Sequence, residues 1–277
     1  MRRVLALVVV ALAVLGAVGL DSLLRIRPED GDAYEPPRAS RDDLADAAGA
    51  RVFFAHQSVG GNILDGVPAV FESHNLATPT VVDLADDPSG LRLVHQRVGK
   101  NGDPLGKIEE FDAILRAGLG KDVDVAILKL CYSDVRAETD VQQVFTHYTA
   151  TIDALQRDYP DVTFIAATVP LSTQRDIKGN LKELLGRGDR YGAEHNVARE
   201  RFNALLRTRY ATGNRLFDVA AIESTAPDGH RVAARHHGDL YYSLAVPYAK
   251  DPGHLNASGA AVAAEGLFAT IAAAIRP

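Results

Sequence analysis

Short apolar runs alternate along this chain with longer stretches in which apolar residues recur every three or four positions. The longer stretches have helical spacing and cover residues 63–73, 107–117, 141–157, 193–210 and 257–275. The short runs are typical of strands buried on both faces and cover residues 52–55, 80–84, 123–130, 162–169 and 216–222. Strands that alternate with helices favour a parallel sheet covered on both faces. We therefore expect an α/β fold, a three-layer α/β/α sandwich with a mostly parallel central sheet.

Two polar stretches interrupt this alternation. Residues 172–190 hold several glycines, and residues 224–249 carry His230, the pair His236-His237 and the pair Tyr241-Tyr242. In open α/β sheets, ligands bind at the carboxyl ends of the strands, where loops of this kind project. We expect both stretches to be loops that form walls of a substrate site.

The chain begins with Met1-Arg2-Arg3 and an unbroken apolar run over residues 4–20. A basic start before such a run is typical of a targeting segment, so we expect a hydrophobic helix over residues 1–28. Two interpretations stay open. Small residues at 17–19 offer a cleavage site for a secretory signal peptide, whereas the apolar residues Leu23, Leu24 and Ile26 favour an uncleaved membrane anchor. Both predict that the rest of the protein is exported.

Residues 29–43 are rich in Pro, Asp, Glu, Gly and Arg, which predicts a flexible, solvated linker. The remaining residues, 44–277, are expected to form one domain, because 47% hydrophobic and 24% charged residues is the balance of a folded protein. The net charge is −6, and the arginines are scattered among acidic residues. The chain therefore has no basic stripe that could bind a phosphate backbone, which argues against nucleic acid as a partner.

Cys131 is the only cysteine, so the chain can form no intramolecular disulfide. It lies in an apolar run, where a buried thiol is expected to have a structural role.

Ser58 follows the first predicted strand and precedes Gly60-Gly61 and a helix. A strand, a tight turn and a helix would expose the serine hydroxyl at the edge of the sheet. The N-terminus of the helix would add backbone N–H donors for a developing oxyanion. The alternative is that Ser58 caps the helix, a common position for serine. The surrounding residues do not form a Gly-x-Ser-x-Gly elbow, which argues against an α/β-hydrolase.

A second motif, Asp251-Pro252-Gly253-His254, comes directly before the last helical stretch. Proline and glycine favour a tight turn, which can bring the Asp251 carboxylate onto the His254 ring and leave the other ring nitrogen free. The alternative is that both residues cap or solvate the turn and the helix that follows.

These motifs, in this order, resemble those of the SGNH (GDSL-like) hydrolases over the chain from about Arg51 to its end. That family has a serine after its first strand, a glycine after its second, a polar block after its third and Asp-x-x-His before its last helix. The matching segments are Ser58, residues 99–103, residues 129–134, and Asp251 with His254.

The resemblance implies that Ser58 is the nucleophile, His254 the general base and acid, and Asp251 its orienting partner. It also implies an oxyanion hole formed by the N–H groups of Ser58 and Gly102, with Gly99 as the alternative glycine. The sequence departs from the family twice. His56-Gln57 stands where the family has Gly-Asp, and Ser133 aligns with the family's oxyanion asparagine, so Ser133, Tyr132 or Asn101 would take that role.

Neither a metal nor an organic cofactor is expected. His236, His237 and Asp239 could bind a metal, but neighbouring histidines point apart and no further ligands follow at a usual spacing. The glycines between 99 and 106 lack the Lys-Ser/Thr ending of a phosphate-binding loop.

We therefore hypothesise an exported serine esterase or deacetylase that removes a small acyl group through an acyl-serine. By analogy with the family, its substrate would be an acylated carbohydrate or cell-envelope polymer. The rival hypothesis is a catalytically inactive module that keeps the fold and binds glycan or a protein partner.

Overall fold

The structure is a computed structural model that describes residues 29–86, 92–175 and 189–276. The hydrophobic segment 1–28 and much of the polar stretch 172–190 lie outside the described residues. The strands in chain order are β1 Glu29–Ala33, β2 Val52–His56, β3 Val81–Asp83, β4 Leu93–Arg97, β5 Val125–Leu128, β6 Thr163–Ala167, β7 Leu216–Phe217, β8 His230–His236, β9 Asp239–Tyr242, β10 Ala249–Asp251 and β11 His254–Leu255. The helices are α2 Arg41–Gly49, α3 Ser58–Asp65, α4 Val67–Ser73, α5 Pro104–Arg116, α6 Val141–Asp158, α8 Ala193–Tyr210, α9 Val219–Ser224 and α10 Ala257–Ile275, with short 3-10 turns η1 Leu119–Lys121 and η2 Val246–Tyr248.

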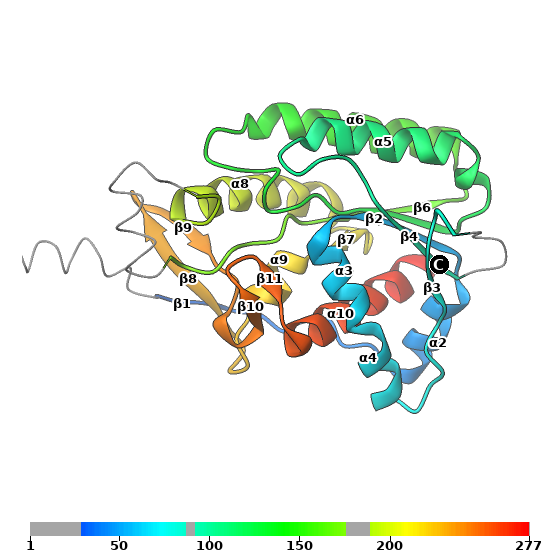
Figure 1. Cartoon of the computed structure of the whole chain (residues 1–277), viewed down its shortest axis with the longest axis horizontal. Helices are drawn as coiled ribbons and strands as arrows, with labels where there is room; N and C mark the ends of the chain where they lie inside the picture. Colours follow the sequence, from blue (N-terminus) through cyan, green and yellow to red (C-terminus); the bar gives the residue numbers. More distant parts are fainter. Residues whose placement is uncertain (1–28, 87–91, 176–188, 277) are drawn as a thin grey trace, which may run out of the picture.

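The central sheet has six strands in the order β3-β4-β2-β5-β6-β7, and every neighbouring pair is parallel. Helices α5, α6 and α8 cover one face, and α2, α3, α4 and α10 cover the other (Figure 1). The three-layer α/β fold expected from the apolar pattern is therefore confirmed. β2 lies near the middle of the sheet and is buried at all five positions, which places its carboxyl end at the centre of one sheet edge.

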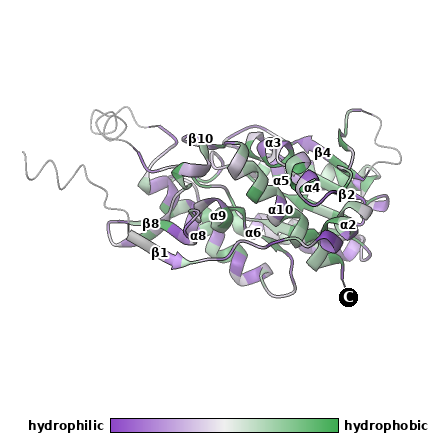
Figure 2. Ribbon diagram, turned by 90° about the horizontal axis from the view of Figure 1, so that it is seen from below, coloured by the Kyte–Doolittle hydropathy of each residue, from purple (hydrophilic) through white to green (hydrophobic). Residues whose placement is uncertain are grey.

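The sheet divides the apolar core in two. One cluster joins α10 and α3 to residues such as Phe54 and Ile127. The other joins α5, α6 and α8 to the alternate residues Phe53 and Ala126. This division follows from the strand pleat, because successive side chains point to opposite faces. Figure 2 shows hydrophobic colouring in the middle of the domain and hydrophilic colouring on outer elements such as α2.

The last helix, α10, is long and apolar enough to cross a membrane, the one such helix among the described residues. Most of its apolar residues are buried against α2, α3, α4 and α9. This is the packing of a core helix, which explains its alanine-rich sequence, since small side chains let neighbouring elements approach closely.

Several predicted elements differ from the observed ones for local reasons. The predicted helix over 63–73 is two helices, because Pro68 lies in the first turn of α4 and cannot continue a helix from α3. The predicted strand over 216–222 ends at Phe217, where the Asp218 carboxylate accepts a bond from Ala221 N and caps α9. β4 was not predicted, because its second half, His95 to Arg97, is polar.

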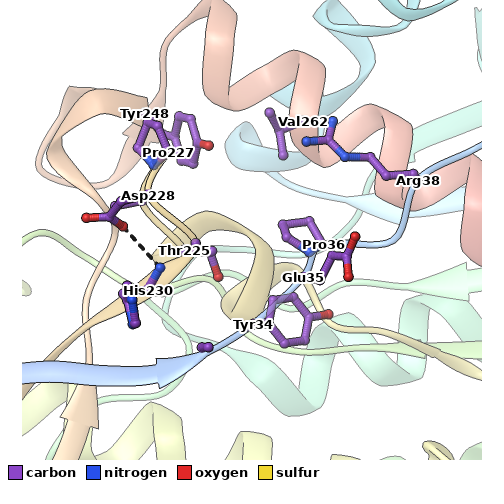
Figure 3. Close-up of a pocket in the computed structure, with 13 residues that line it drawn as sticks. Tyr34, Glu35, Pro36, Arg38, Thr225, Pro227, Asp228, His230, Tyr248 and Val262 are labelled. Atoms are coloured by element: carbon purple, nitrogen blue, oxygen red, sulfur yellow. Dashed lines mark hydrogen bonds between the residues drawn. The ribbon is translucent and has the colours of Figure 1, made fainter.

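Residues 29–43 were predicted to be a flexible linker, but the structure shows them packed on the domain. β1 pairs with β8 in a three-stranded antiparallel sheet, and Ser40 forms a capping box at the start of α2. Tyr34, Pro36 and Arg38 line a pocket of about 620 Å³ against residues 225–230 and α10 (Figure 3). Composition predicted a solvated chain, whereas backbone pairing, which composition does not report, holds this segment on the domain. The predicted loop over 224–249 likewise contains the β8–β9 hairpin.

Candidate active site

Ser58 is the first residue of α3, directly after β2. Gln57 is the N-cap residue, and no side chain caps this helix, so the structure does not support the capping interpretation of Ser58. The Gln57 amide instead donates to the carbonyl oxygens of Val98 (2.7 Å) and Gly99 (3.0 Å). This pair of bonds ties the end of β2 to the loop after β4 and sets the direction in which Ser58 leaves the sheet.

His254 and Asp251 lie on the two strands of a small hairpin, β11 and β10, joined by Pro252 and Gly253. His254 Nδ1 is 2.8 Å from Asp251 Oδ1 and 2.9 Å from Oδ2. The Asp251 carboxylate also accepts a hydrogen bond from Gly253 N at 2.9 Å. The turn thus holds the carboxylate against one ring nitrogen, as the spacing predicted.

The opposite ring nitrogen, His254 Nε2, lies 3.0 Å from Ser58 Oγ. Ser58, His254 and Asp251 therefore form one continuous hydrogen-bonded chain. With the Nδ1 proton donated to Asp251, Nε2 can accept the proton of the Ser58 hydroxyl. This is the geometry in which an imidazole can activate a serine hydroxyl.

Asp251 stays ionised at neutral pH. Partial burial raises the pKa of its carboxyl, but the hydrogen bonds from Gly253 N and from His254 outweigh it and lower the pKa below its usual value of 3.8. A negative charge beside Nδ1 stabilises the imidazolium that forms when His254 takes a proton.

The two glycines predicted as oxyanion donors have N–H groups that are already engaged. Gly102, in a positive-φ conformation (φ 91°), donates to Asp134 Oδ1 at 2.8 Å. Gly99 (φ 57°) donates to Glu110 Oε2 at 2.7 Å. In this structure neither N–H is free for a substrate oxygen, because a carboxylate competes for each.

Other donors lie in the same region. Ser133 Oγ is buried and has no hydrogen-bond partner among the described residues. The Asn101 side-chain oxygen accepts from Lys107 Nζ at 3.1 Å, which leaves the NH₂ group of that amide with no described partner. Ser58 N–H lies at the first turn of α3, where backbone N–H groups have no helical acceptor.

Sequence reasoning missed the ion pair between Lys107 and Asp134. Lys107 Nζ is 2.6 Å from Asp134 Oδ2, and both side chains are fully buried. Asp134 also accepts from Cys131 N at 2.6 Å, so one carboxylate fixes the loop after β5 and the Gly102 turn together. The sequence did hold a signal for Lys107, because this lysine occupies one of the buried, otherwise apolar positions of the amphipathic helix α5.

Tyr132 packs against the histidine of the site. Its ring is 5.9 Å from the His254 ring, between centroids. The Tyr132 carbonyl accepts from Arg199 Nε at 2.9 Å, and the buried Arg199 guanidinium lies 5.5 Å from the Tyr132 ring. Burial lowers the pKa of Arg199 to about 10, which leaves it cationic at neutral pH.

A pocket of about 710 Å³ opens beside the loops after β4 and β5. Its lining is polar and includes Gly102 and Ser133 of the predicted oxyanion hole, but not Ser58. The lining residues are Asn101, Gly102, Ser133, Arg136, Glu138, Asp189, Arg190, Glu194 and His195. β4, β2 and β5 are neighbours in the sheet, so the loops at their carboxyl ends share one edge with Ser58. We call this the polar pocket.

The other residues considered from the sequence are placed elsewhere. The His236 and His237 rings lie 4.2 Å apart, between centroids, at the turn of the β8–β9 hairpin. Among the described residues, no group of three or more His, Cys, Asp or Glu side chains could hold a metal ion. Cys131 is buried and unpaired.

The sequence matches no protein-family model and no curated protein. Solved structures that it resembles include a candidate platelet activating factor from Streptococcus pneumonia, with 15% identity, a TM-score of 0.48, and coverage of 82% of this chain and 89% of that chain. A candidate lipolytic protein of the G-D-S-L family from Desulfitobacterium hafniense DCB-2 shares 12% identity, with a TM-score of 0.43 and coverage of 80% and 99%.

The periplasmic domain of a lipopolysaccharide acetyltransferase from Salmonella ser. Paratyphi A also shares 12% identity, with a TM-score of 0.43 and coverage of 90% of this chain and 92% of that chain. The likeness in each case is one of overall fold.

Proposed function

We propose that this protein is an exported serine esterase or deacetylase. Ser58 is the nucleophile, His254 the general base and acid, and Asp251 the group that orients the imidazole. The observation that carries the proposal is the position of the His254 ring, with Nε2 3.0 Å from Ser58 Oγ and Nδ1 2.8 Å from Asp251 Oδ1.

In the acylation step, Ser58 Oγ attacks the ester carbonyl carbon while its proton moves to His254 Nε2. The tetrahedral intermediate collapses when the C–O bond to the alcohol breaks and His254 returns the proton to the leaving oxygen. A water molecule then attacks the acyl-serine, gives its proton to His254, and releases the carboxylic acid and free Ser58. Atoms and charge balance with no group other than these side chains and water.

The oxyanion of each tetrahedral intermediate needs hydrogen-bond donors. We propose the N–H of Ser58, the Ser133 hydroxyl and the Asn101 amide. Gly102 N–H already donates to Asp134 Oδ1, so it could bind the oxyanion only by weakening that hydrogen bond. Gly102 is therefore the weaker candidate. The polar pocket favours an acylated carbohydrate or cell-envelope polymer as substrate.

The second candidate function is an inactive module that binds glycan or protein. The engaged N–H groups of Gly102 and Gly99 favour it, because an esterase without oxyanion donors would lose most of its rate.

Labelling with a fluorophosphonate probe separates the two functions. The soluble fragment that begins at Glu29 should be labelled as wild type and should not be labelled as Ser58→Ala, and only the former should hydrolyse 4-nitrophenyl acetate. The matched control is Ser73→Ala, which removes a serine hydroxyl at the end of α4. Equal labelling of all three proteins, or none in folded wild type together with no ester turnover, would favour the binding module.

A further inference from the structure

The polar pocket is unsuited to a hydrocarbon chain. Five of its lining residues carry a formal charge, namely Arg136, Glu138, Asp189, Arg190 and Glu194. An alkyl chain placed there would remove water from charged groups and offer no hydrogen bonds in return, which is unfavourable. The pocket therefore fits a polar part of a substrate.

The carboxylates of this pocket already have cationic partners. Arg136 Nε lies 3.1 Å from Glu138 Oε1. Arg175, which is almost fully buried, places Nη2 2.9 Å from Glu194 Oε1 and 3.2 Å from Asp189 Oδ1. Each of the three lining carboxylates thus has a guanidinium partner, and Asp189 and Glu194 share that of Arg175.

Arg190 differs from the other arginines of the region. Its carbonyl accepts a hydrogen bond from Arg199 Nη2 at 2.7 Å, and the same buried guanidinium holds the Tyr132 carbonyl. The backbone of Arg190 is thereby fixed beside Tyr132. Its exposed guanidinium makes no hydrogen bond or ion pair with any residue in the described parts of the chain. A guanidinium offers five N–H donors in a planar fork that matches a carboxylate or phosphate.

The charge of Arg190 also acts close to the triad. Burial raises the pKa of the Tyr132 phenol, and the positive charge of Arg190 partly offsets that rise. Tyr132 in turn packs on His254. Ser133 lines the same pocket, and its buried hydroxyl has no hydrogen-bond partner in the part of the chain that the structure describes. The Arg190 cation and the Ser133 hydroxyl thus line one pocket, and Ser133 directly follows Tyr132, which packs on His254.

We propose that the polar pocket binds an oxyanion, a carboxylate or a phosphate, on the alcohol part of the ester, with the Arg190 guanidinium as its partner. This inference rests on the proposed function and narrows its substrate to an acylated acidic sugar. The anion belongs to the alcohol because a small acyl group has no second functional group.

The test compares three mono-O-acetylated methyl glycosides that differ only at carbon 6. These are the neutral glucoside, the glucuronoside and the glucoside 6-phosphate. Wild type should hydrolyse at least one anionic sugar with a kcat/KM about ten-fold or more above that of the neutral sugar, about the value of one charge-assisted hydrogen bond. The anion that gives the larger ratio identifies the source of the charge.

Arg190→Gln should bring this ratio close to one. The matched control is Arg157→Gln, because Arg157 is exposed on α6 and belongs neither to the triad nor to the lining of the polar pocket. It removes the same charge and should keep the wild-type ratio. A wild type that hydrolyses 4-nitrophenyl acetate but treats all three sugars alike would overturn this inference and leave the proposed function standing.

Binding to the Ser58→Ala variant, measured by calorimetry, separates the two proposals. The acetylated anionic sugar should bind, and the double variant Ser58→Ala/Arg190→Gln should bind it about ten-fold more weakly or worse. If no ester is hydrolysed but this Arg190-dependent binding is found, the proposed function fails and the anion site stands. If the Ser58→Ala variant shows no preference for the anionic sugars, the anion site is wrong.

Discussion

The rings of Tyr132 and His254 meet edge to face, with an angle of 82° between their planes. Tyr132 is 3% exposed, and its carbonyl is held by the buried Arg199. A fixed aromatic ring against one side of the imidazole restricts how far His254 can tilt. Tyr132 is therefore a positioning residue for the proposed general base.

Gly253→Ala tests this contact. A Cβ atom at Gly253 would lie 2.6 Å from Tyr132 Cζ and 2.9 Å from its hydroxyl oxygen, so either the tyrosine ring or the histidine turn must move. Because small misplacements of catalytic groups slow reactions strongly, we expect kcat to fall about 10–100-fold. Gly49→Ala, where an added Cβ would meet nothing within 4 Å, should keep the wild-type kcat. Full activity in Gly253→Ala would show that the contact is dispensable.

Asp251→Asn tests the orienting carboxylate. The amide keeps the size of the side chain but removes the charge that favours the Nδ1 proton and stabilises the imidazolium. We expect kcat to fall by about 10³–10⁴-fold with a near-wild-type thermal midpoint, since Asp251 is 45% exposed. Steady-state kinetics on 4-nitrophenyl acetate, beside a thermal melt, measures both. A loss below ten-fold would contradict the proposed role.

Ser133→Ala tests the hydroxyl proposed for the oxyanion hole. Removing one such donor slows related enzymes about 10²–10³-fold in kcat, so we expect a loss of at least ten-fold, with KM little changed. Ser133→Asn supplies a side-chain N–H in place of the hydroxyl and should retain part of the activity. If Ser133→Ala turns over at the wild-type rate, the donors are the backbone and Asn101 alone.

His56 makes the stability of the fold depend on pH. Burial lowers the pKa of its ring to about 3, while its hydrogen bond to the Gln57 carbonyl oxygen opposes that shift. At a pH below 6.5, the ordinary pKa of histidine, His56 is protonated in the unfolded chain but stays neutral in the folded chain. The free energy of unfolding should therefore fall as the pH drops from 6.5 towards 3, by about 1.4 kcal/mol per pH unit from this group.

Urea unfolding at pH 7.5 and pH 5.0 measures this effect. From pH 7.5 to pH 5.0, the free energy of unfolding should fall by about 2 kcal/mol more in wild type than in His56→Gln, because glutamine cannot take up the proton. His230→Gln, at an exposed position of β8, should show the wild-type difference. Parallel behaviour of wild type and His56→Gln would mean that His56 is accessible to protons in the folded state.

Much of the fold could be predicted from local patterns. The expected helices over 193–210 and 257–275 coincide with α8 and α10, because apolar residues at helical spacing report burial of one face. β1 could not be predicted in this way. Its residues, Glu29 to Ala33, carry no apolar alternation, and the strand exists only because β8 offers unpaired backbone groups beside it.

The amino-acid sequence by itself determined the local half of the site. Asp251 and His254 are three residues apart across a Pro-Gly turn, so their contact needs only short-range geometry. Ser58 and His254 are 196 positions apart, and only the packing of α3 and α10 on one face of the sheet decided that they meet. The hydrogen bond from Gly102 N–H to Asp134 likewise depends on which loops lie together at the sheet edge, as does the lack of a partner for the Arg190 guanidinium among the described residues. Hydrogen bonds are short and directional, so spacing along a chain cannot show them until the fold has closed the distance between distant segments.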